Sequence, residues 1–527
     1  AAGIAVLKAG GNAVDAAVAV AFALAVTHPS AGNIGGGGFM IVQLADGQRT
    51  AIDYREVAPL KATRDMYLDP KTGGTTKASV LGPLAAGVPG TVAGMELVHA
   101  RFGTKPWAEL IAPGIALARD GHALEASHAE SMQEAAKAMS AAGFKDSARV
   151  YLGADGQPIP TGGVWKQPEL ADTLERIAQQ GATAFYTGKL AAQIVERMQQ
   201  IGGIWGERDL AEYKAIEREP LRFEYLGHEV ITMPPPSGGG IVMRQMLYAS
   251  ELLEFRKYPA RSPEAFHLYV ESARRAYADR NEWLGDPAFV NIPTAGLLDP
   301  GYIKSRMADI DPAHATASSS IRAGAPDKSA VDTTHFSVVD RAGNAVSNTY
   351  TLNGGFGAKI VLPGLGILLN NEMDDFAAAP GKPNAYGLVQ GERNAIEPRK
   401  RMLSSMSPTV LRKDGELRAV LGTPGGPTIT TTVVQLVRDL VDYGMPLDQA
   451  VRAPRVHHQW LPDQVIVEPE VEPALADGLR ARGHKVESMP FTGGHIGHAD
   501  CIEVDPATRG FRAVADVTRG GGSAQAY

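Results

Sequence analysis

Two threonines, set apart by a predicted hairpin, are the residues of this sequence whose spacing could do chemistry. The runs 334–340 and 345–353 are rich in β-branched and aromatic residues, and 341–344 has the composition of a turn. With a three-residue loop, counting back along both strands sets Thr333 opposite Thr351, and a two- or four-residue loop shifts this pairing by one position. The pattern therefore predicts two hydroxyl groups that face each other where the first strand begins.

The chemistry of this pair depends on whether the chain is cut between Asp332 and Thr333. In an intact chain, facing threonines are ordinary stabilisers of a sheet. After a cut, Thr333 carries a free α-amine beside its own hydroxyl. An α-amine has an unperturbed pKa of roughly 7.7 to 8.0, so it can accept the hydroxyl proton and act as a general base. The spacing alone leaves both interpretations open.

Other motifs in the chain favour the catalytic interpretation. They are spread from the N-terminal part to the last third, at 12–17, 27–29, 35–40, 53–56, 87–94, 332–340, 350–353, 368–376, 403–408 and 424–426. In this order they resemble the gamma-glutamyltranspeptidase family, and the resemblance covers nearly the whole chain. Two positions depart from the family pattern. Met402 stands where proline is more frequent, and 515–522 replaces an Asp-Pro-Arg pattern.

The resemblance implies that the chain cuts itself before Thr333 and becomes a heterodimer of a large subunit, 1–332, and a small subunit, 333–527. It implies the N-terminal-nucleophile hydrolase fold, an α/β (α+β) sandwich of two stacked, mainly antiparallel sheets between helical layers (αββα). Periodicity by itself shows only that helices and strands are mixed.

The resemblance also implies the reaction. Thr333 would attack the γ-glutamyl amide of glutathione or a related compound, and an amino acid, a short peptide or water would then take the glutamyl group. Thr351 would orient the Thr333 hydroxyl, while backbone N–H groups of Gly425 and Gly426 would stabilise the oxyanion. Without the family, Gly425 and Gly426 are equally well read as a tight turn. No cofactor is implied.

A second group of residues is implied to hold the glutamyl head of the substrate. It comprises a cationic and hydroxyl set for the α-carboxylate (Arg55, Ser404 and Ser405), an acceptor set for the α-ammonium (Asn353, Glu372 and Asp375), and Tyr386 in a lid loop, 379–391. Taken from the residues alone, Arg55 is read as a surface arginine, the acidic run 370–375 as a solvated loop and 379–391 as a simple connector.

Composition limits the other classes of function. The formal net charge of −7 and the lack of a basic run give no support to nucleic-acid binding. The most apolar stretch, Ala13–Val26, is too short to span a bilayer and contains Asp15, so no membrane span is predicted. The chain begins without Met or a leader, and we expect that a preceding segment with any signal peptide is missing. A periplasmic or secreted location is implied by the resemblance alone.

Three other functions stay open at this point. A cephalosporin or glutaryl acylase resembles this family but needs a pocket that accepts a side chain without the α-ammonium, and the presence of Asn353, Glu372 and Asp375 argues against it. An uncleaved, non-catalytic binding protein would keep the fold. A zinc hydrolase would use histidines and an acid near the C-terminus, yet we expect no metal because no third cluster supports them; these residues are His457, His458, His495, His498 and Asp500.

The sequence predicts only some of the helices and strands that must position these residues. Helical periodicity is clear at 168–179, 189–200, 264–280 and 429–443, and 417–421 reads as a strand. We interpret the glycine run 35–38 as a tight turn with close backbone approach. The small polar residues of 313–329 are typical of a mobile linker before the cut.

Overall fold

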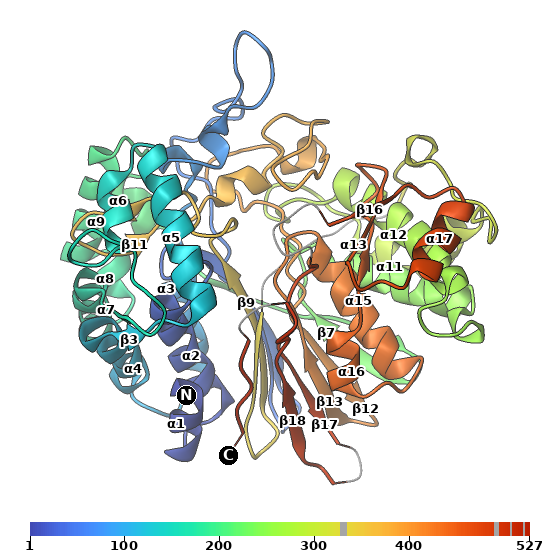
Figure 1. Ribbon diagram of the computed structural model, residues 1–527, viewed down its shortest axis with the longest axis horizontal. Coiled ribbons are helices and arrows are strands. Elements are labelled where there is room, and N and C mark those ends of the chain that lie inside the picture. Colours follow the sequence, from blue (N-terminus) through green and yellow to red (C-terminus); the bar gives the residue numbers. More distant parts are fainter. Residues whose placement is uncertain (327–334, 490–494, 506–507, 520–521, 527) are drawn as a thin grey trace.

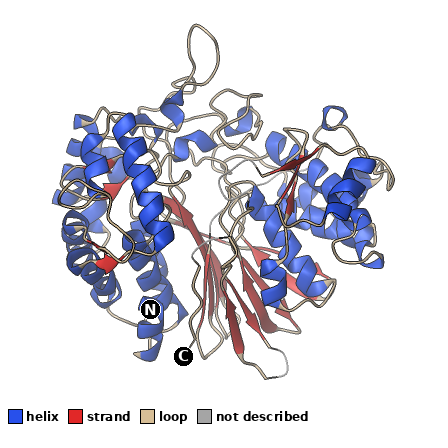
Figure 2. Ribbon diagram, in the orientation of Figure 1, coloured by secondary structure: helices blue, strands red, loops and turns tan. Residues whose placement is uncertain are grey.

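The computed structural model describes residues 1–326, 335–489, 495–505, 508–519 and 522–526. Two antiparallel sheets lie face to face between two groups of helices, so the chain has the αββα arrangement that the resemblance implied (Figure 1 and Figure 2). Within the described ranges, no helix is both long enough and apolar enough to cross a bilayer.

The first large sheet has five strands in the order β5-β2-β1-β9-β8, and every neighbouring pair is antiparallel. Its strands are β1 (Gly37–Gln43), β2 (Arg49–Asp53), β5 (Ile216–Arg218), β8 (Phe336–Val339) and β9 (Ala345–Thr351).

The second large sheet has six strands in the order β18-β17-β13-β12-β7-β6, again all antiparallel. Its strands are β6 (Leu221–Tyr225), β7 (His228–Thr232), β12 (Thr409–Lys413), β13 (Glu416–Leu421), β17 (Cys501–Val504) and β18 (Phe511–Val514). Three small sheets complete the strands, built from β3 (His122–Ala123) with β4 (Val164–Trp165), β10 (Val361–Leu362) with β11 (Ile367–Leu368), and β14 (Val456–His457), β15 (Val465–Val467) and β16 (Val486–Ser488).

The helices form two outer layers, one against each large sheet (Figure 1). The layer beside the first sheet contains α1 (Ala2–Lys8), α2 (Ala13–Thr27), α3 (Thr91–Phe102), α4 (Trp107–Asp120), α5 (Ala126–Ala141), α6 (Lys145–Val150), α7 (Pro168–Gln180), α8 (Thr183–Tyr186), α9 (Lys189–Gln200) and α10 (Glu207–Ala211). The other layer contains α11 (Gly239–Leu252), α12 (Pro263–Trp283), α13 (Thr294–Leu298), α14 (Pro300–Met307), α15 (Thr428–Val441), α16 (Leu447–Arg452) and α17 (Pro473–Ala481). Single 3-10 turns are η1 (Lys77–Ser79), η2 (Pro83–Ala85), η3 (Phe255–Lys257), η4 (Ser318–Ser320), η5 (Glu372–Asp375) and η6 (Glu392–Asn394).

Strand alternation explains why both faces of the first sheet are buried. Successive side chains of a strand point to opposite faces. In β1, Phe39 and Ile41 belong to the apolar layer between the two sheets, whereas Met40 and Val42 belong to the core shared with the outer helices. Both faces of the first sheet therefore bury apolar surface, which holds its strands in one register.

The predicted hairpin is confirmed, and its strands are β8 and β9. Asp340 N–H donates to the Asn344 carbonyl at 3.0 Å, and Phe336 lies opposite Asn348, which is the register of a three-residue loop. A carboxylate oxygen of Asp340 also accepts the N–H of Ala13 at 3.0 Å, so the hairpin loop caps the start of α2. Thr333 and Asp332 lie outside the described residues, so the pairing of Thr333 with Thr351 stays a prediction.

The expectation for the glycine run 35–38 is half right. Gly37 and Gly38 are not in a turn, because they form the start of β1. The close approach is real, since a Cβ atom on Gly36 would lie 2.0 Å from the Thr351 carbonyl oxygen and one on Gly38 would lie 2.4 Å from that of Thr349. Only glycine lets the chain approach β9 this closely where β1 begins.

The interpretation of 313–329 as a mobile linker is wrong for the part that is described, 313–326. Ser318 is fully buried, and its N–H donates to the Asp463 carboxylate at 2.7 Å. Both the backbone and the small side chains of this segment make contacts, since Ser318 Oγ accepts from Arg274 and Thr316 Oγ1 accepts from Arg275 at 3.4 Å.

We predict that Phe39→Ala lowers the free energy of unfolding by about 3 to 5 kcal/mol, because it empties part of the apolar layer that joins the two sheets. Phe511→Ala is the matched control, since that phenylalanine also lies in a strand but is 41% exposed. Urea unfolding followed by circular dichroism measures both. An equal loss of stability in the two variants would contradict the layer described above.

Candidate active site

Arg55 lies two residues after the end of β2, and its side chain is fully buried. Its guanidinium contacts the Glu372 carboxylate, donates to Asp375 at 2.6 Å, and donates from Nε to the Met402 carbonyl oxygen at 3.3 Å. The interpretation of Arg55 as a surface residue is therefore wrong. A buried guanidinium needs carboxylate partners, and two of the predicted ammonium-binding residues supply them.

The register of the first sheet sets Arg55 and Thr351 on either side of one glycine. Tyr54 and Gly38 exchange backbone hydrogen bonds, which carries Arg55 to the level of Gly37. Gly37 also pairs with Thr351 on the other side. Continuing the observed β8–β9 register by three residues would set Thr333 next in this row.

Three carboxyl groups surround the single guanidinium of Arg55. Besides Glu372 and Asp375, Glu56 lies 3.6 Å from the guanidinium, and neither of its oxygens has a hydrogen-bond partner among the described residues. The Oε2 atom of Glu372 is also buried without such a partner in that part of the chain. The cluster therefore has an excess of acceptors and of negative charge, which favours a cationic donor.

The pKa values of this cluster reflect the same imbalance. Burial, opposed in part by Arg55, raises the pKa of Glu56 from about 4.5 to about 7. Burial also raises the pKa of Glu372 well above its usual value, and that of Asp375 moves in the same direction. Protons held by these carboxyls in the free protein can leave when a cation supplies the missing charge.

The acidic run 372–375 forms η5 and is buried, so the reading of it as a solvated loop is wrong. Asn370 supports it, since one side-chain oxygen accepts from Gly87 N–H at 2.9 Å and from Glu372 N–H at 3.0 Å. Asp374 instead accepts from Ser79 Oγ at 2.8 Å and from Ala385 N–H at 2.9 Å. One short turn thus aims two acids at Arg55 and a third at the loop 379–391.

Asn353 lies just beyond β9 with a φ of 73°, a left-handed conformation that asparagine tolerates. Its N–H donates to Thr351 Oγ1 at 2.7 Å, and its side-chain amide donates to the Asn371 carbonyl oxygen at 3.0 Å. Asn353 therefore connects the end of β9 to the residue that precedes the acidic turn. The Thr351 hydroxyl accepts this bond and keeps its own proton for donation elsewhere.

Tyr386 brings the loop 379–391 over this site, so the loop is more than a connector. Its hydroxyl donates to the Asn353 carbonyl oxygen at 2.9 Å, and Gln459 donates to the Tyr386 carbonyl at 3.1 Å. A Cβ atom on Gly426 would lie 3.0 Å from the Tyr386 ring. The ring therefore lies between the Asn353 region and the glycine pair.

Gly425 and Gly426 lie just before α15, with φ values of 136° and 58° that favour glycine. No acceptor for either N–H is found among the described residues. Backbone N–H groups at a helix N-terminus are suited to stabilise negative charge. The geometry is compatible with an oxyanion site as well as with a turn.

Ser404 and Ser405 are buried in the segment that follows Met402. The Ser404 carbonyl accepts from Gly238 N–H at 3.3 Å, and the Ser405 carbonyl accepts from Thr430 Oγ1 at 3.3 Å. Because Arg55 contacts the Met402 carbonyl, this segment borders the guanidinium.

The C-terminal histidines are engaged in separate pairs. His457 contacts Thr431 at 2.8 Å and Gln459 at 2.9 Å, while His495 pairs with Glu470 and His498 with Asp500. Within the described part of the chain, no group of three His, Cys, Asp or Glu side chains could hold a metal ion.

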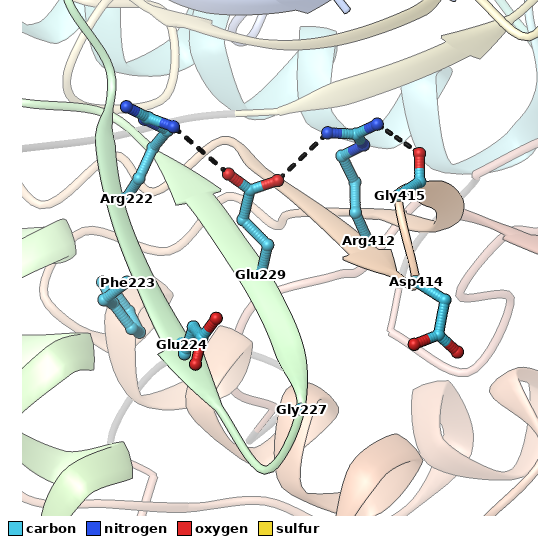
Figure 3. A pocket seen from close by; sticks show the side chains of 8 residues that line it. All are labelled: Arg222, Phe223, Glu224, Gly227, Glu229, Arg412, Asp414 and Gly415. Atoms are coloured by element: carbon cyan, nitrogen blue, oxygen red, sulfur yellow. Dashed lines mark hydrogen bonds and ion pairs between the residues drawn. The ribbon is translucent and has the colours of Figure 1, made fainter.

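A hollow at the β6–β7 edge of the second sheet is a different kind of feature (Figure 3). There Glu229 accepts from Arg49 at 2.9 Å, from Arg412 at 3.1 Å and from Arg222 at 3.5 Å. Because Arg49 belongs to β2 and Glu229 to β7, the charges tie the two sheets together and have no nucleophile beside them.

Sequence reasoning gave no role to Glu56 or Asp374, although both stood inside quoted motifs. Adjacent charged residues can face the same site only where the backbone leaves a strand, as it does after β2. The position of Glu56 at a strand end beside Arg55 was the available signal. For Asp374 there was none, because its partners are distant in sequence.

We predict that Glu56→Gln removes a pH dependence of stability. The folded protein holds the Glu56 proton more tightly than the unfolded chain, so the contribution of this group to the free energy of unfolding falls as pH rises from about 4.5 to about 7. The variant should match the wild type near pH 4.5 and exceed it by up to about 3 kcal/mol above pH 7. Urea unfolding at both pH values measures this, with the exposed Glu130→Gln as control. A difference that does not change with pH would contradict the assignment.

Comparisons with known proteins identify the family of this chain. The family model described as gamma-glutamyltranspeptidase matches residues 1–526. The glutathione hydrolase proenzyme of Escherichia coli (strain K12) is 47% identical over 522 residues, covering 97% of this chain and 90% of the relative. The Acylase ACY 1 proenzyme of Pseudomonas sp. (strain SE83) is 37% identical over 501 residues, covering 94% and 86%. The crystal structure of cephalosporin acylase from Bacillus halodurans has a TM-score of 0.87 at 27% identity, covering 100% of this chain and 94% of that one. The chain therefore belongs to the gamma-glutamyltranspeptidase family.

Proposed function

We propose that this protein is a self-cleaving gamma-glutamyltranspeptidase and glutathione hydrolase with Thr333 as its nucleophile. The observation that carries the proposal is the buried cluster in which the carboxyls of Glu56, Glu372 and Asp375 surround Arg55. A glutamyl head group is a zwitterion, so its carboxylate can take N–H groups of the guanidinium while its ammonium takes the carboxylates. The zwitterion is neutral overall, so its binding replaces ion pairs within the protein by ion pairs with the ligand and adds no net charge to the site.

Self-cleavage would generate the nucleophile. Thr333 Oγ attacks the carbonyl carbon of Asp332, the peptide C–N bond breaks, and the ester that forms is hydrolysed by water. The products are 1–332 and 333–527, which stay together because each large sheet contains strands from both segments. The pairings of β1 with β9 and of β7 with β12 support this heterodimer.

Turnover would follow the same chemistry on a γ-glutamyl amide. The α-amine of Thr333 accepts the hydroxyl proton, Oγ attacks the γ-carbonyl carbon, and Thr351 holds Oγ in place. Gly425 and Gly426 stabilise the oxyanion, and the amide nitrogen leaves with a proton. An amino acid, a peptide or water then attacks the glutamyl ester. Ser404 and Ser405 support the substrate carboxylate, and Tyr386 shields the ester.

A periplasmic or secreted location is part of the proposal. It is supported only by membership of the family.

Cephalosporin or glutaryl acylase activity is the second candidate, favoured by the acylase relatives. One matched pair of substrates separates the two, because glutaryl p-nitroanilide is γ-glutamyl p-nitroanilide without the α-ammonium. Each charge-assisted hydrogen bond contributes about 1.5 to 3 kcal/mol, so losing the ammonium should lower kcat/KM at least about 100-fold. A preference for the glutaryl substrate would contradict the proposal and support the acylase.

Asp375→Asn tests the origin of that preference. The variant keeps a hydrogen-bond acceptor but loses one charge, so we expect kcat/KM to fall for the γ-glutamyl substrate and to change little for the glutaryl one. Glu229→Gln serves as control, because it removes an equally bridged carboxylate far from Arg55. If Asp375→Asn lowers kcat/KM for both substrates alike, the carboxylate does not recognise the ammonium.

A further inference from the structure

Two side-chain sockets of the same design hold the segment that leads to the proposed cleavage point. At Ser318, the backbone N–H donates to the Asp463 carboxylate at 2.7 Å, and the Trp460 indole N–H donates to the backbone carbonyl at 3.1 Å. An aspartate and a tryptophan thus take both backbone polar groups of a single residue, a more specific arrangement than general packing.

Gly324 is held in the same way six residues later. Its N–H donates to Asp279 at 2.8 Å, and the Trp283 indole N–H donates to its carbonyl oxygen at 2.9 Å. A Cβ atom on Gly324 would lie 2.3 Å from the Tyr302 hydroxyl, so a larger residue would have to displace that side chain.

The two sockets come from different sides of the proposed cut. Asp279 and Trp283 lie on α12, one turn apart, in the segment before residue 333. Trp460 and Asp463 lie after it. The Ser318 socket therefore tethers the segment before the cut to the proposed small subunit.

Resting on the proposed function, we propose that Trp283 and Trp460 are positioning residues for self-cleavage that have no part in turnover. His335, two residues beyond Thr333 in the sequence, is also held by side chains. His335 contacts Ser337 at 2.5 Å and both Ser347 and Thr349 at 3.3 Å. Because Gly324 and His335 are both held, the chain between them has fixed ends. Fixed ends restrict the conformations of that chain, and we infer that they raise the fraction of time in which the Thr333 hydroxyl is oriented to attack the Asp332 carbonyl carbon.

Loosening these sockets should affect the rate of self-cleavage and the rate of turnover differently. In the precursor, the bond to be cut is part of the tethered chain, so loosening the tether slows the reaction. In the processed enzyme, the nucleophile is no longer joined to the tethered segment and the substrate arrives by diffusion, so loosening the tether leaves turnover as it was. A general disturbance of the fold would lower both.

Three tryptophan-to-phenylalanine substitutions test this with one chemical change. Trp283→Phe and Trp460→Phe each remove one indole N–H from a socket and keep an aromatic ring. Trp107→Phe is the control, because its indole N–H donates to the Ile177 carbonyl at 3.0 Å in the other helical layer. The full chain is synthesised in a cell-free system with a pulse of label, and conversion of the precursor to two chains is followed by denaturing gel. Fully converted enzyme is then assayed with γ-glutamyl p-nitroanilide.

We expect each socket variant to slow conversion about three- to tenfold, the effect of one hydrogen bond, and the double variant to slow it more than either. Conversion of Trp107→Phe should stay within about twofold of wild type, as should kcat and KM of all converted enzymes. The proposal is overturned if the double variant converts at the wild-type rate, if Trp107→Phe is slowed equally, or if kcat falls in proportion to conversion. Should the double variant fail to fold, the single variants decide by the same criteria. A wild-type chain that never converts overturns the proposed function as well, and this outcome is distinct from the others.

Discussion

The buried charge of Arg55 is the constraint on which the rest of the site depends. A guanidinium without exposed surface is stable only beside carboxylates, and those of Arg55 come from a turn more than 300 residues further along the chain. The pairing can form only when the end of β2 and η5 meet. Three carboxyls around one guanidinium leave the cluster short of positive charge, and under the proposed function this deficit favours a ligand that brings an ammonium together with a carboxylate.

The first sheet sets that charge cluster beside the end of β9. Gly37 lies between Arg55, just past the end of β2, and Thr351 of β9, and the absence of side chains at Gly36 and Gly38 lets the strands approach. The row continues toward the position predicted for Thr333. Under the proposed function, the sheet would set head-group recognition and the nucleophile a few strand spacings apart. The glycine pair before α15 faces this row across the Tyr386 ring.

Local sequence patterns predicted the elements well where local forces decide them. The β8–β9 hairpin and the strand 417–421 follow from turn residues and β-branched composition. The burial of 372–375 and the anchoring of Ser318 could not be predicted in this way. Both depend on partners, Arg55 and Asp463, that only the folded chain brings near. Composition reports how often such residues are exposed in general, and a single distant contact reverses the expectation.

Intact mass spectrometry of the purified wild-type protein beside Thr333→Ala tests the central claim most directly. The account predicts that wild type gives two chains, the smaller beginning at Thr333, while the variant remains a single uncut chain. A wild-type protein that stays whole would have no free threonine amine and would contradict the account. Cleavage of the Thr333→Ala variant at the same bond would also contradict it, because the cut would then not depend on the Thr333 hydroxyl.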